Sequence, residues 1–125
     1  MSAEEYEKYS INPEILFQPL EKIDITKLIA KSTKKWQNHA LCEVNDCVVR
    51  FGVIEGEFHW HKHDKEDEFF YVIEGKLLID LEEETIELEK GQGSVVPKQI
   101  LHRTRAPIRT SIIMIEGKTV KPTGD

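Results

Sequence analysis

Apolar and polar residues alternate in short stretches through most of the chain beyond Trp36. Alternation with a period of two, in segments rich in β-branched and aromatic residues, is typical of strands. The pattern predicts about nine strands, at residues 40–44, 47–54, 59–63, 68–74, 76–81, 85–88, 93–96, 102–106 and 110–115. Turn-forming residues such as Pro107 separate them, and no gap holds a crossover helix. We therefore expect antiparallel sheets closed into a sandwich or barrel.

The first 35 residues have a different pattern. Leu20, Ile23, Leu28 and Ile29 stand among polar residues at a spacing compatible with a helix. We expect an N-terminal extension over residues 1–35 with room for a helix, a barrel over 36–116, and a polar, extended tail over 117–125.

Composition limits the class of protein. A chain of 125 residues, 39% hydrophobic and 32% charged, suits one globular domain. The net charge is −6 and the basic residues form no stripe, which argues against nucleic acid as a partner. No apolar run approaches the roughly 20 residues that span a bilayer, and the first residues do not resemble a signal peptide. The expected compartment is the cytoplasm, with no membrane partner.

Two cysteines are present, and their spacing bears on whether they pair. A two-residue turn at residues 45–46 would place Cys42 opposite Val49 and Cys47 opposite Val44, so that the two sulfurs lie diagonally on one face. Diagonal neighbours are poorly placed for a disulfide. We predict free, mostly buried thiols.

Three of the five histidines lie at alternate positions in the stretch HWHKHDKEDE. In a strand, His59, His61 and His63 would share one face. A turn over the acidic residues 64–67 would return Glu68 beside His61 and His63. Imidazole and carboxylate groups are common ligands of transition metals. Closely spaced histidines also occur on merely polar strand faces, and the spacing alone leaves both interpretations open.

A second segment, GQGSVVPKQILH, contains a glycine turn, an apolar pair, a proline turn and one further histidine, His102, at the start of a strand. That residue would supply a third nitrogen. Together the two segments resemble the two motifs of the cupin superfamily. The first motif has five matching positions, which are Gly56, His61, His63, Glu68 and Gly75. The second motif has three, which are Gly91, Pro97 and His102.

The chain departs from the motifs at three points. Four residues separate Gly56 from His61, one fewer than usual, and Gln99 and Ala106 stand where glycine and asparagine are expected. These changes affect a turn and a supporting hydrogen bond. The resemblance covers residues 47–115, and from residue 36 onward the chain is similar to small single-domain cupins often labelled mannose-6-phosphate isomerase-like.

The resemblance implies a double-stranded β-helix, or jelly-roll barrel, that binds one divalent transition metal. The implied ligands are His61, His63, Glu68 and His102. Iron, manganese, nickel, cobalt, copper and zinc all suit such ligands, and the sequence does not choose among them. The resemblance also implies a small-molecule ligand in the barrel and a homodimer. His59 is left over. The alternatives are a hydrogen-bond donor that supports a ligand, a substrate contact, and a surface histidine at a strand end, and we favour the last.

Alternation predicts which side chains surround the ligand. The interior is expected to hold Phe70, Val72, Phe51, Val53, Thr104 and one set from residues 112–115. The opposite face, with Trp60, Phe69, Tyr71 and Ile73, is too apolar to be left exposed, so either residues 15–17 or a second subunit should cover it. The arginines Arg50, Arg103, Arg105 and Arg109 are not obviously inward, which argues against a sugar phosphate as substrate.

Two functions are left open by these residues. The first is a metal-dependent enzyme, a dioxygenase, isomerase or lyase, acting on a small polar metabolite. The alternative is a non-catalytic small-molecule or sugar-binding module. A transcriptional regulator is disfavoured because the extension lacks a basic cluster and room for a DNA-binding domain. No catalytic residue and no organic cofactor can be assigned from the sequence.

Overall fold

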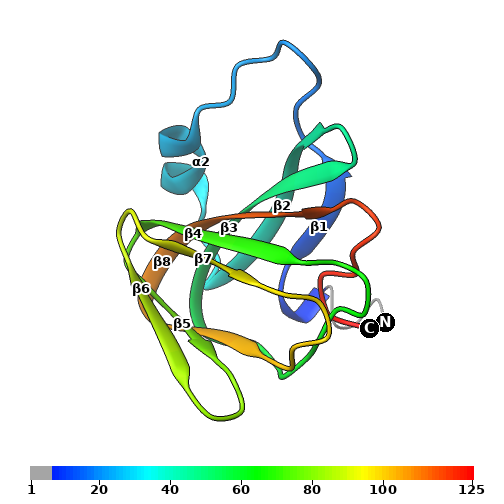
Figure 1. Ribbon diagram of the computed structural model, residues 1–125. Coiled ribbons are helices and arrows are strands. Elements are labelled where there is room, and N and C mark those ends of the chain that lie inside the picture. The colour runs from blue at the N-terminus through cyan, green and yellow to red at the C-terminus, as the bar shows by residue number, and fades with distance from the viewer. Residues whose placement is uncertain (1–6) are drawn as a thin grey trace.

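The computed structural model describes residues 7–125, which form a rolled β-sheet structure with a helical segment on one side (Figure 1). In chain order the elements are β1 (Ile11–Ile15), α2 (Ile25–Lys31), β2 (Trp36–Val44), β3 (Cys47–Glu57), β4 (Glu68–Glu74), β5 (Lys76–Asp80), β6 (Thr85–Glu89), β7 (Gly93–Val96) and β8 (Arg103–Gly117). The strands pair in the order β1-β2-β3-β8-β4-β7, and the hairpin β5-β6 joins through β8. The all-β jelly-roll architecture that the sequence predicts is confirmed.

Strand β8 connects the two halves of the roll. Its first part pairs with β5, its last part pairs with β4, and β3 pairs with it along most of its length. The prediction of two strands separated at Pro107 is wrong. The register of β8 with β3 shifts between Ile54 and Gly56, and Pro107 lies in the part of β8 that this shift skips. Its missing N–H therefore costs no ladder hydrogen bond.

The histidine stretch at residues 59–63 is not a strand, contrary to the prediction. Only His61 forms a bridge, in which it exchanges backbone hydrogen bonds of 2.8 and 2.9 Å with His102. The neighbouring carbonyl groups accept from loops instead, since the His63 carbonyl accepts from the Gln99 N–H and the Lys62 carbonyl accepts from the Asp125 N–H. The bridge to His102 fixes where the stretch lies.

The N-terminal residues form an edge strand that the sequence pattern does not reveal. β1 pairs in parallel with β2, so the prediction of wholly antiparallel sheets is wrong at this edge. The sequence of β1, INPEI, contains Pro13 and lacks regular alternation. An edge strand tolerates proline because one of its sides makes no ladder hydrogen bonds.

Helix α2 begins at a capping aspartate, Asp24, whose carboxylate accepts from the Lys27 N–H at 3.1 Å. The helix and the segment before it pack on the outside of the sheet. The apolar residues that form this contact are Phe17, Ile23, Ile25, Leu28 and Ile29 from the extension and Leu41, Phe51 and Val53 from the sheet. The prediction that Phe51 and Val53 line the interior is therefore wrong. β3 is buried on both faces between residues 50 and 54, so hydrophobicity does not show which set faces inward.

The hairpin between β2 and β3 has the predicted register. Cys42 pairs with Val49 and Val44 pairs with Cys47 across the turn at residues 45–46. Both cysteines are free, as predicted. Each is half-buried, which makes the thiols more accessible than the sequence pattern suggested.

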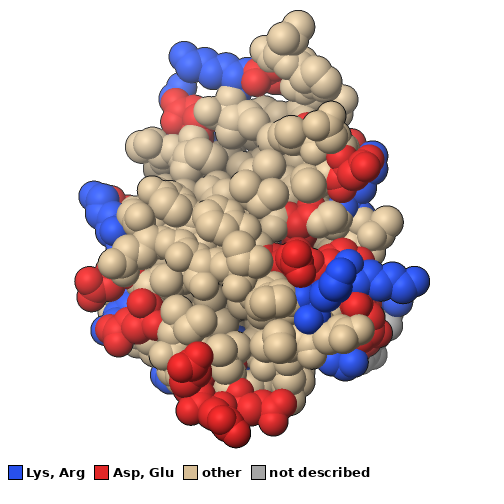
Figure 2. All heavy atoms as spheres, viewed as in Figure 1, with Lys and Arg blue, Asp and Glu red and all other residues tan. Residues whose placement is uncertain are grey.

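The exposed surface of β4, β7 and β8 carries Tyr71, Val95 and Ile115 and forms an outer apolar face. These side chains are 39%, 52% and 37% exposed. Figure 2 shows a broad area without charged residues across this side of the molecule. The extension covers the neighbouring Ile73 but leaves the rest open. Trp60 lies elsewhere, with the Arg103 guanidinium 5.3 Å above its ring. No helix in the described part of the chain has the length and apolar character to cross a membrane.

Candidate metal centre

Four side chains from three separate segments meet at one end of the barrel interior. His61 and His63 come from the connection between β3 and β4, Glu68 is the first residue of β4, and His102 immediately precedes β8. One potential ligand atom from each residue lies within 4.8 Å of the others. The structure thus brings together the four residues that the motif resemblance selects, and we call them the His-Glu cluster.

Backbone carbonyl groups orient two of the imidazoles. The Nδ1 atoms of His61 and His102 lie 3.0 and 2.8 Å from the carbonyl oxygens of His59 and Ile100. A carbonyl oxygen only accepts, so each Nδ1 carries the hydrogen and each Nε2 keeps its lone pair. This is the tautomer that an Nε2-bound metal requires.

The atoms that face the centre of the cluster are buried and lack hydrogen bonds. Glu68 Oε1 lies 3.4 Å from His63 Nε2 and 3.6 Å from His102 Nε2. None of these three atoms has a hydrogen-bond partner among residues 7–125. Buried polar atoms are normally satisfied, so a set of them converging on one point fits a bound cation. The donor set, neutral nitrogen and carboxylate oxygen without thiolate, suits a first-row divalent metal.

The local electrostatics favour the ligand protonation states. Burial, with help from His102, lowers the pKa of His61 to about 4, which keeps that ring neutral near pH 7. Burial raises the pKa of Glu68, but His102 and His63 more than offset it, so the carboxyl pKa is well below its usual range. Burial lowers the pKa of His63, while Glu68 raises it by more. A divalent ion would replace the proton that Glu68 favours on His63.

A second buried carboxylate lies beside the cluster. Glu116 on β8 is directly opposite Glu68 on β4 in the antiparallel register. Its Oε1 lies 2.8 Å from the Nε atom of Arg50 on β3, and both residues are almost fully buried. Burial and the charge on Glu68 raise the pKa of Glu116 well above its usual value. Arg50, which the sequence did not mark as inward, is therefore buried in the interior beside Glu116.

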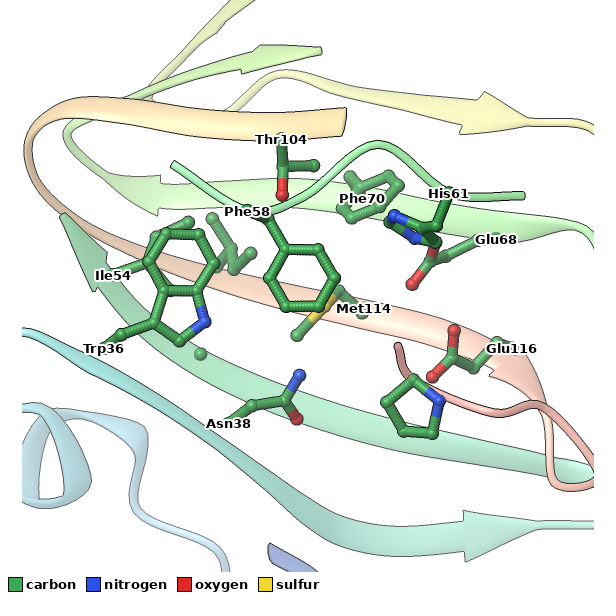
Figure 3. A pocket seen from close by; sticks show the side chains of 13 residues that line it. Trp36, Asn38, Ile54, Phe58, His61, Glu68, Phe70, Thr104, Met114 and Glu116 are labelled. Atoms are coloured by element: carbon green, nitrogen blue, oxygen red, sulfur yellow. The ribbon is translucent and has the colours of Figure 1, made fainter. Parts of the chain in front are cut away.

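A pocket extends from the His-Glu cluster through the barrel (Figure 3). Its cavity volume is about 30 Å³, so only a very small ligand fits without movement of the pocket walls. The walls are mostly apolar and come from Trp36, Gly52, Ile54, Phe58, Phe70, Ile112 and Met114. The predicted positions at Phe70 and Thr104, and a set from residues 112–115, do line it, while Gly52 and Ile54 take the place of Phe51 and Val53.

The C-terminal residues form a strap beside the cluster, contrary to the prediction of an extended tail. The Thr123 carbonyl accepts from His59 Nε2 at 2.7 Å, and Asp125 accepts from the Asp64 N–H at 2.6 Å. Gly124 has a φ of 97°, and a Cβ there would lie 2.5 Å from that of His61. Only glycine lets the strap approach so closely. His59 is part-buried and also contacts the Tyr9 hydroxyl at 3.1 Å, so it is not a surface histidine.

The turn before His102 keeps its shape although a glycine of the motif is replaced. Gln99 has a φ of 68°, the left-handed conformation that glycine adopts most easily. Its N–H donates to the His63 carbonyl at 2.7 Å, which ties the two motif segments together. Arg103 and Arg105, as expected, face away from the pocket and pair with Asp80, with Nε to Oδ2 distances of 2.8 and 2.7 Å.

Sequence reasoning missed three polar residues of the pocket region, Asn38, Arg50 and Glu116. Arg50 alternates with Gly52 and Ile54 and therefore shares their inward face. Glu116 ends an apolar run in β8, where a charged residue is unusual. This isolated charged residue was the available sign of a functional position. The residues that surround Glu116 in space depend on strand pairing, which the sequence pattern does not show.

The jelly-roll barrel and the His-Glu cluster together define a class of protein, the small barrels with a site for a divalent metal. The model of the Cupin domain family matches residues 48–116, and the chain belongs to this family.

Known relatives agree with this assignment. The uncharacterized protein YdbB of Bacillus subtilis (strain 168) is 41% identical over 101 residues, which are 79% of this chain and 89% of that protein. The crystal structure of a cupin-2 domain containing protein from Shewanella frigidimarina is 33% identical, with a TM-score of 0.72, and the match covers 76% of this chain and 93% of that one. Protein NMB1881 from Neisseria meningitidis, 24% identical with a TM-score of 0.69 over 78% of this chain and 99% of that one, has the same fold.

Proposed function

We propose that this protein binds one divalent transition metal through His61, His63, Glu68 and His102 and is a metal-dependent enzyme acting on a small polar metabolite. The observation that carries the proposal is the convergence of unpartnered buried nitrogen and oxygen atoms on one point at the end of a pocket, within the described residues. Four protein ligands leave about two positions of an octahedral ion open. A bound metal would supply Lewis acidity or oxygen activation.

The chain's own residues would prepare the site for such chemistry. Backbone carbonyl groups hold the imidazole rings of His61 and His102 in the tautomer with a free Nε2. Phe58, Phe70 and Met114 line the pocket and exclude water from a bound molecule. These features suit a dioxygenase, an isomerase or a lyase.

One observation favours a non-catalytic binding module as the second candidate. Glu116, the carboxylate beside the cluster, is engaged by Arg50 at 2.8 Å. An acid held in an ion pair is less available for proton transfer than a free one. Ligand binding without turnover would then be the function of the pocket.

Metal analysis tests the proposed site. Protein purified without a histidine tag and without chelators is expected to contain about one equivalent of a single first-row metal per chain. The copurified metal then selects the assay, which is oxygen consumption for iron and isomerase or lyase panels for the others. A protein that holds little metal and takes none up on titration would contradict the proposal, and metal without turnover in any panel would favour the binding module.

We also propose that two copies of the chain pair through the outer apolar face. An exposed area formed by Tyr71, Val95 and Ile115 is typical of an interface, and both acidic and basic side chains, among them Asp67 and Lys118, border it. Because both signs of charge border the face, two copies related by a two-fold axis can place acidic side chains of one opposite basic side chains of the other.

Light scattering after gel filtration tests the pairing. We expect a mass of about 29 kDa, twice the 14.5 kDa chain. Val95→Lys is expected to shift the mass to that of the monomer because a lysine would be buried without a partner. Ile108→Lys is the matched control, since Ile108 is exposed outside this face. A wild-type monomer at high concentration would refute the pairing.

A further inference from the structure

The pocket contains polar groups that have no part in the His-Glu cluster. Glu116 on β8 and Asn38 on β2 point into the same space as Glu68 (Figure 3). Glu116 is 3% exposed. Its Oε2 atom, and Asn38 Oδ1, lack a hydrogen-bond partner in the part of the chain that the structure describes.

An acceptor left without a donor in a buried site is costly. Arg50 Nε lies 2.8 Å from Glu116 Oε1 and pairs with that oxygen, so the pocket acceptors without a donor among residues 7–125 are Glu116 Oε2 and Asn38 Oδ1. The free energy lost for each buried acceptor without a donor is large enough that native structures rarely leave such an atom unpaired. Glu116 and Asn38 are therefore suited to receive hydrogen bonds from a molecule that enters the pocket.

The balance of charge indicates the sign of that molecule. A divalent ion brings two positive charges and Glu68 offsets one of them, while Arg50 and Glu116 together add no net negative charge. Net positive charge is therefore left in a buried, mostly apolar site, where an unpaired charge is strongly unfavourable. A negatively charged ligand would offset it.

We propose that the pocket selects a small hydroxycarboxylate, with its carboxylate at the His-Glu cluster and a further hydroxyl group donating to Glu116. This inference rests on the metal site of the proposed function and names the ligand class for it. A carboxylate with a neighbouring hydroxyl can fill two adjacent open positions of a metal. The hydroxyl farther along the molecule would reach Glu116, with Asn38 as a second acceptor.

Three probes separate the parts of this inference. Glycerate has a carboxylate and two hydroxyl groups, lactate lacks the terminal hydroxyl, and glycerol lacks the carboxylate. Each is titrated into the Co²⁺-loaded protein by calorimetry, and the visible absorption of the cobalt reports coordination. We expect glycerate to bind roughly 10-fold or more tightly than lactate. This is the gain in affinity expected from one additional hydrogen bond to a charged acceptor. Glycerol should bind most weakly.

Variants assign the discrimination to the pocket. The double variant Arg50→Met/Glu116→Leu removes the polar wall without changing the net charge of the site. It should keep full cobalt and bind glycerate and lactate equally. Asn38→Leu, which leaves the ion pair intact, should reduce the preference for glycerate in part. The matched control is Asp80→Asn, which alters a buried arginine-paired carboxylate that does not line the pocket and should leave the preference unchanged.

The outcomes distinguish this inference from the proposed function. Wild-type protein that takes up no cobalt would overturn both. A cobalt-loaded protein that binds glycerol as well as glycerate, or that does not distinguish glycerate from lactate, would overturn only the ligand class. A double variant that keeps the wild-type preference would overturn the role of Glu116.

Discussion

Replacing His102 by alanine is expected to lower the bound metal from about one equivalent per chain to a small fraction, with the barrel still folded. Loss of a direct ligand should reduce metal affinity by about 100-fold or more, since loss of an outer supporting contact alone costs 10- to 100-fold. His61→Ala should have the same effect, because its free Nε2 faces the same centre. Elemental analysis and circular dichroism measure metal and fold on the same samples.

The fold should survive because the apolar core does not depend on the metal. The main core cluster comprises residues such as Ile54, Leu77, Ile79 and Ile112, which come from β3, β5 and β8. Zinc fingers unfold without metal because they lack such a core. His39→Ala is the matched control, since His39 lies on β2 outside the cluster. Full metal content in both the His61 and the His102 variants would rule out the assigned ligands.

Arg50→Met is expected to destabilise the protein by about 3–5 kcal/mol. The change removes the positive partner of Glu116 and leaves that carboxylate buried directly opposite Glu68. Where Glu116 is ionised, the two buried carboxylates repel each other; because its pKa is already raised and Arg50 no longer lowers it, Glu116 takes up a proton as the pH falls and the loss becomes smaller. Urea unfolding of the metal-free protein gives the free energy of unfolding without a contribution from metal affinity.

The double variant Arg50→Met/Glu116→Leu provides the control for this prediction. Apolar residues of similar volume often replace a buried ion pair at little cost. We expect the double variant to recover most of the free energy lost in Arg50→Met. If Arg50→Met alone costs less than about 1 kcal/mol, the level of an exposed ion pair, the contact between Arg50 and Glu116 is not the stabilising pair described here.

Local spacing was sufficient to predict that three of the four residues of the His-Glu cluster lie close together. His61 and His63 are two residues apart, and a short acidic turn separates them from Glu68, so their proximity follows from chain geometry over a few residues. His102 is distant in sequence, and only the motif resemblance connected it with the others. The backbone bridge between His61 and His102 is the contact that brings it there.

Other features could not be obtained from local patterns. Phe51 and Gly52 are both buried, so only the packing of α2 on one side of β3 decides which of them faces the pocket. Pro107 indicates a strand end, but a register shift in a neighbouring strand removes the need for its N–H. The polar strap at Thr123 and Gly124 has no hydrophobic pattern, and its position depends on single hydrogen bonds to the histidine stretch.

The sequence by itself determined the all-β class, the hairpin register at residues 45–46, and the four residues able to hold a metal. The class and the register depend on a period of two and a two-residue turn, which are short-range properties of the chain. The fourth metal-holding residue, His102, came from the motif resemblance. The tertiary structure alone decided that Arg50 and Glu116 are buried together beside Glu68, and that Asn38 shares their pocket. Those contacts join β2, β3, β4 and β8, and pairing between distant strands is set by the packing of the whole barrel rather than by any one segment.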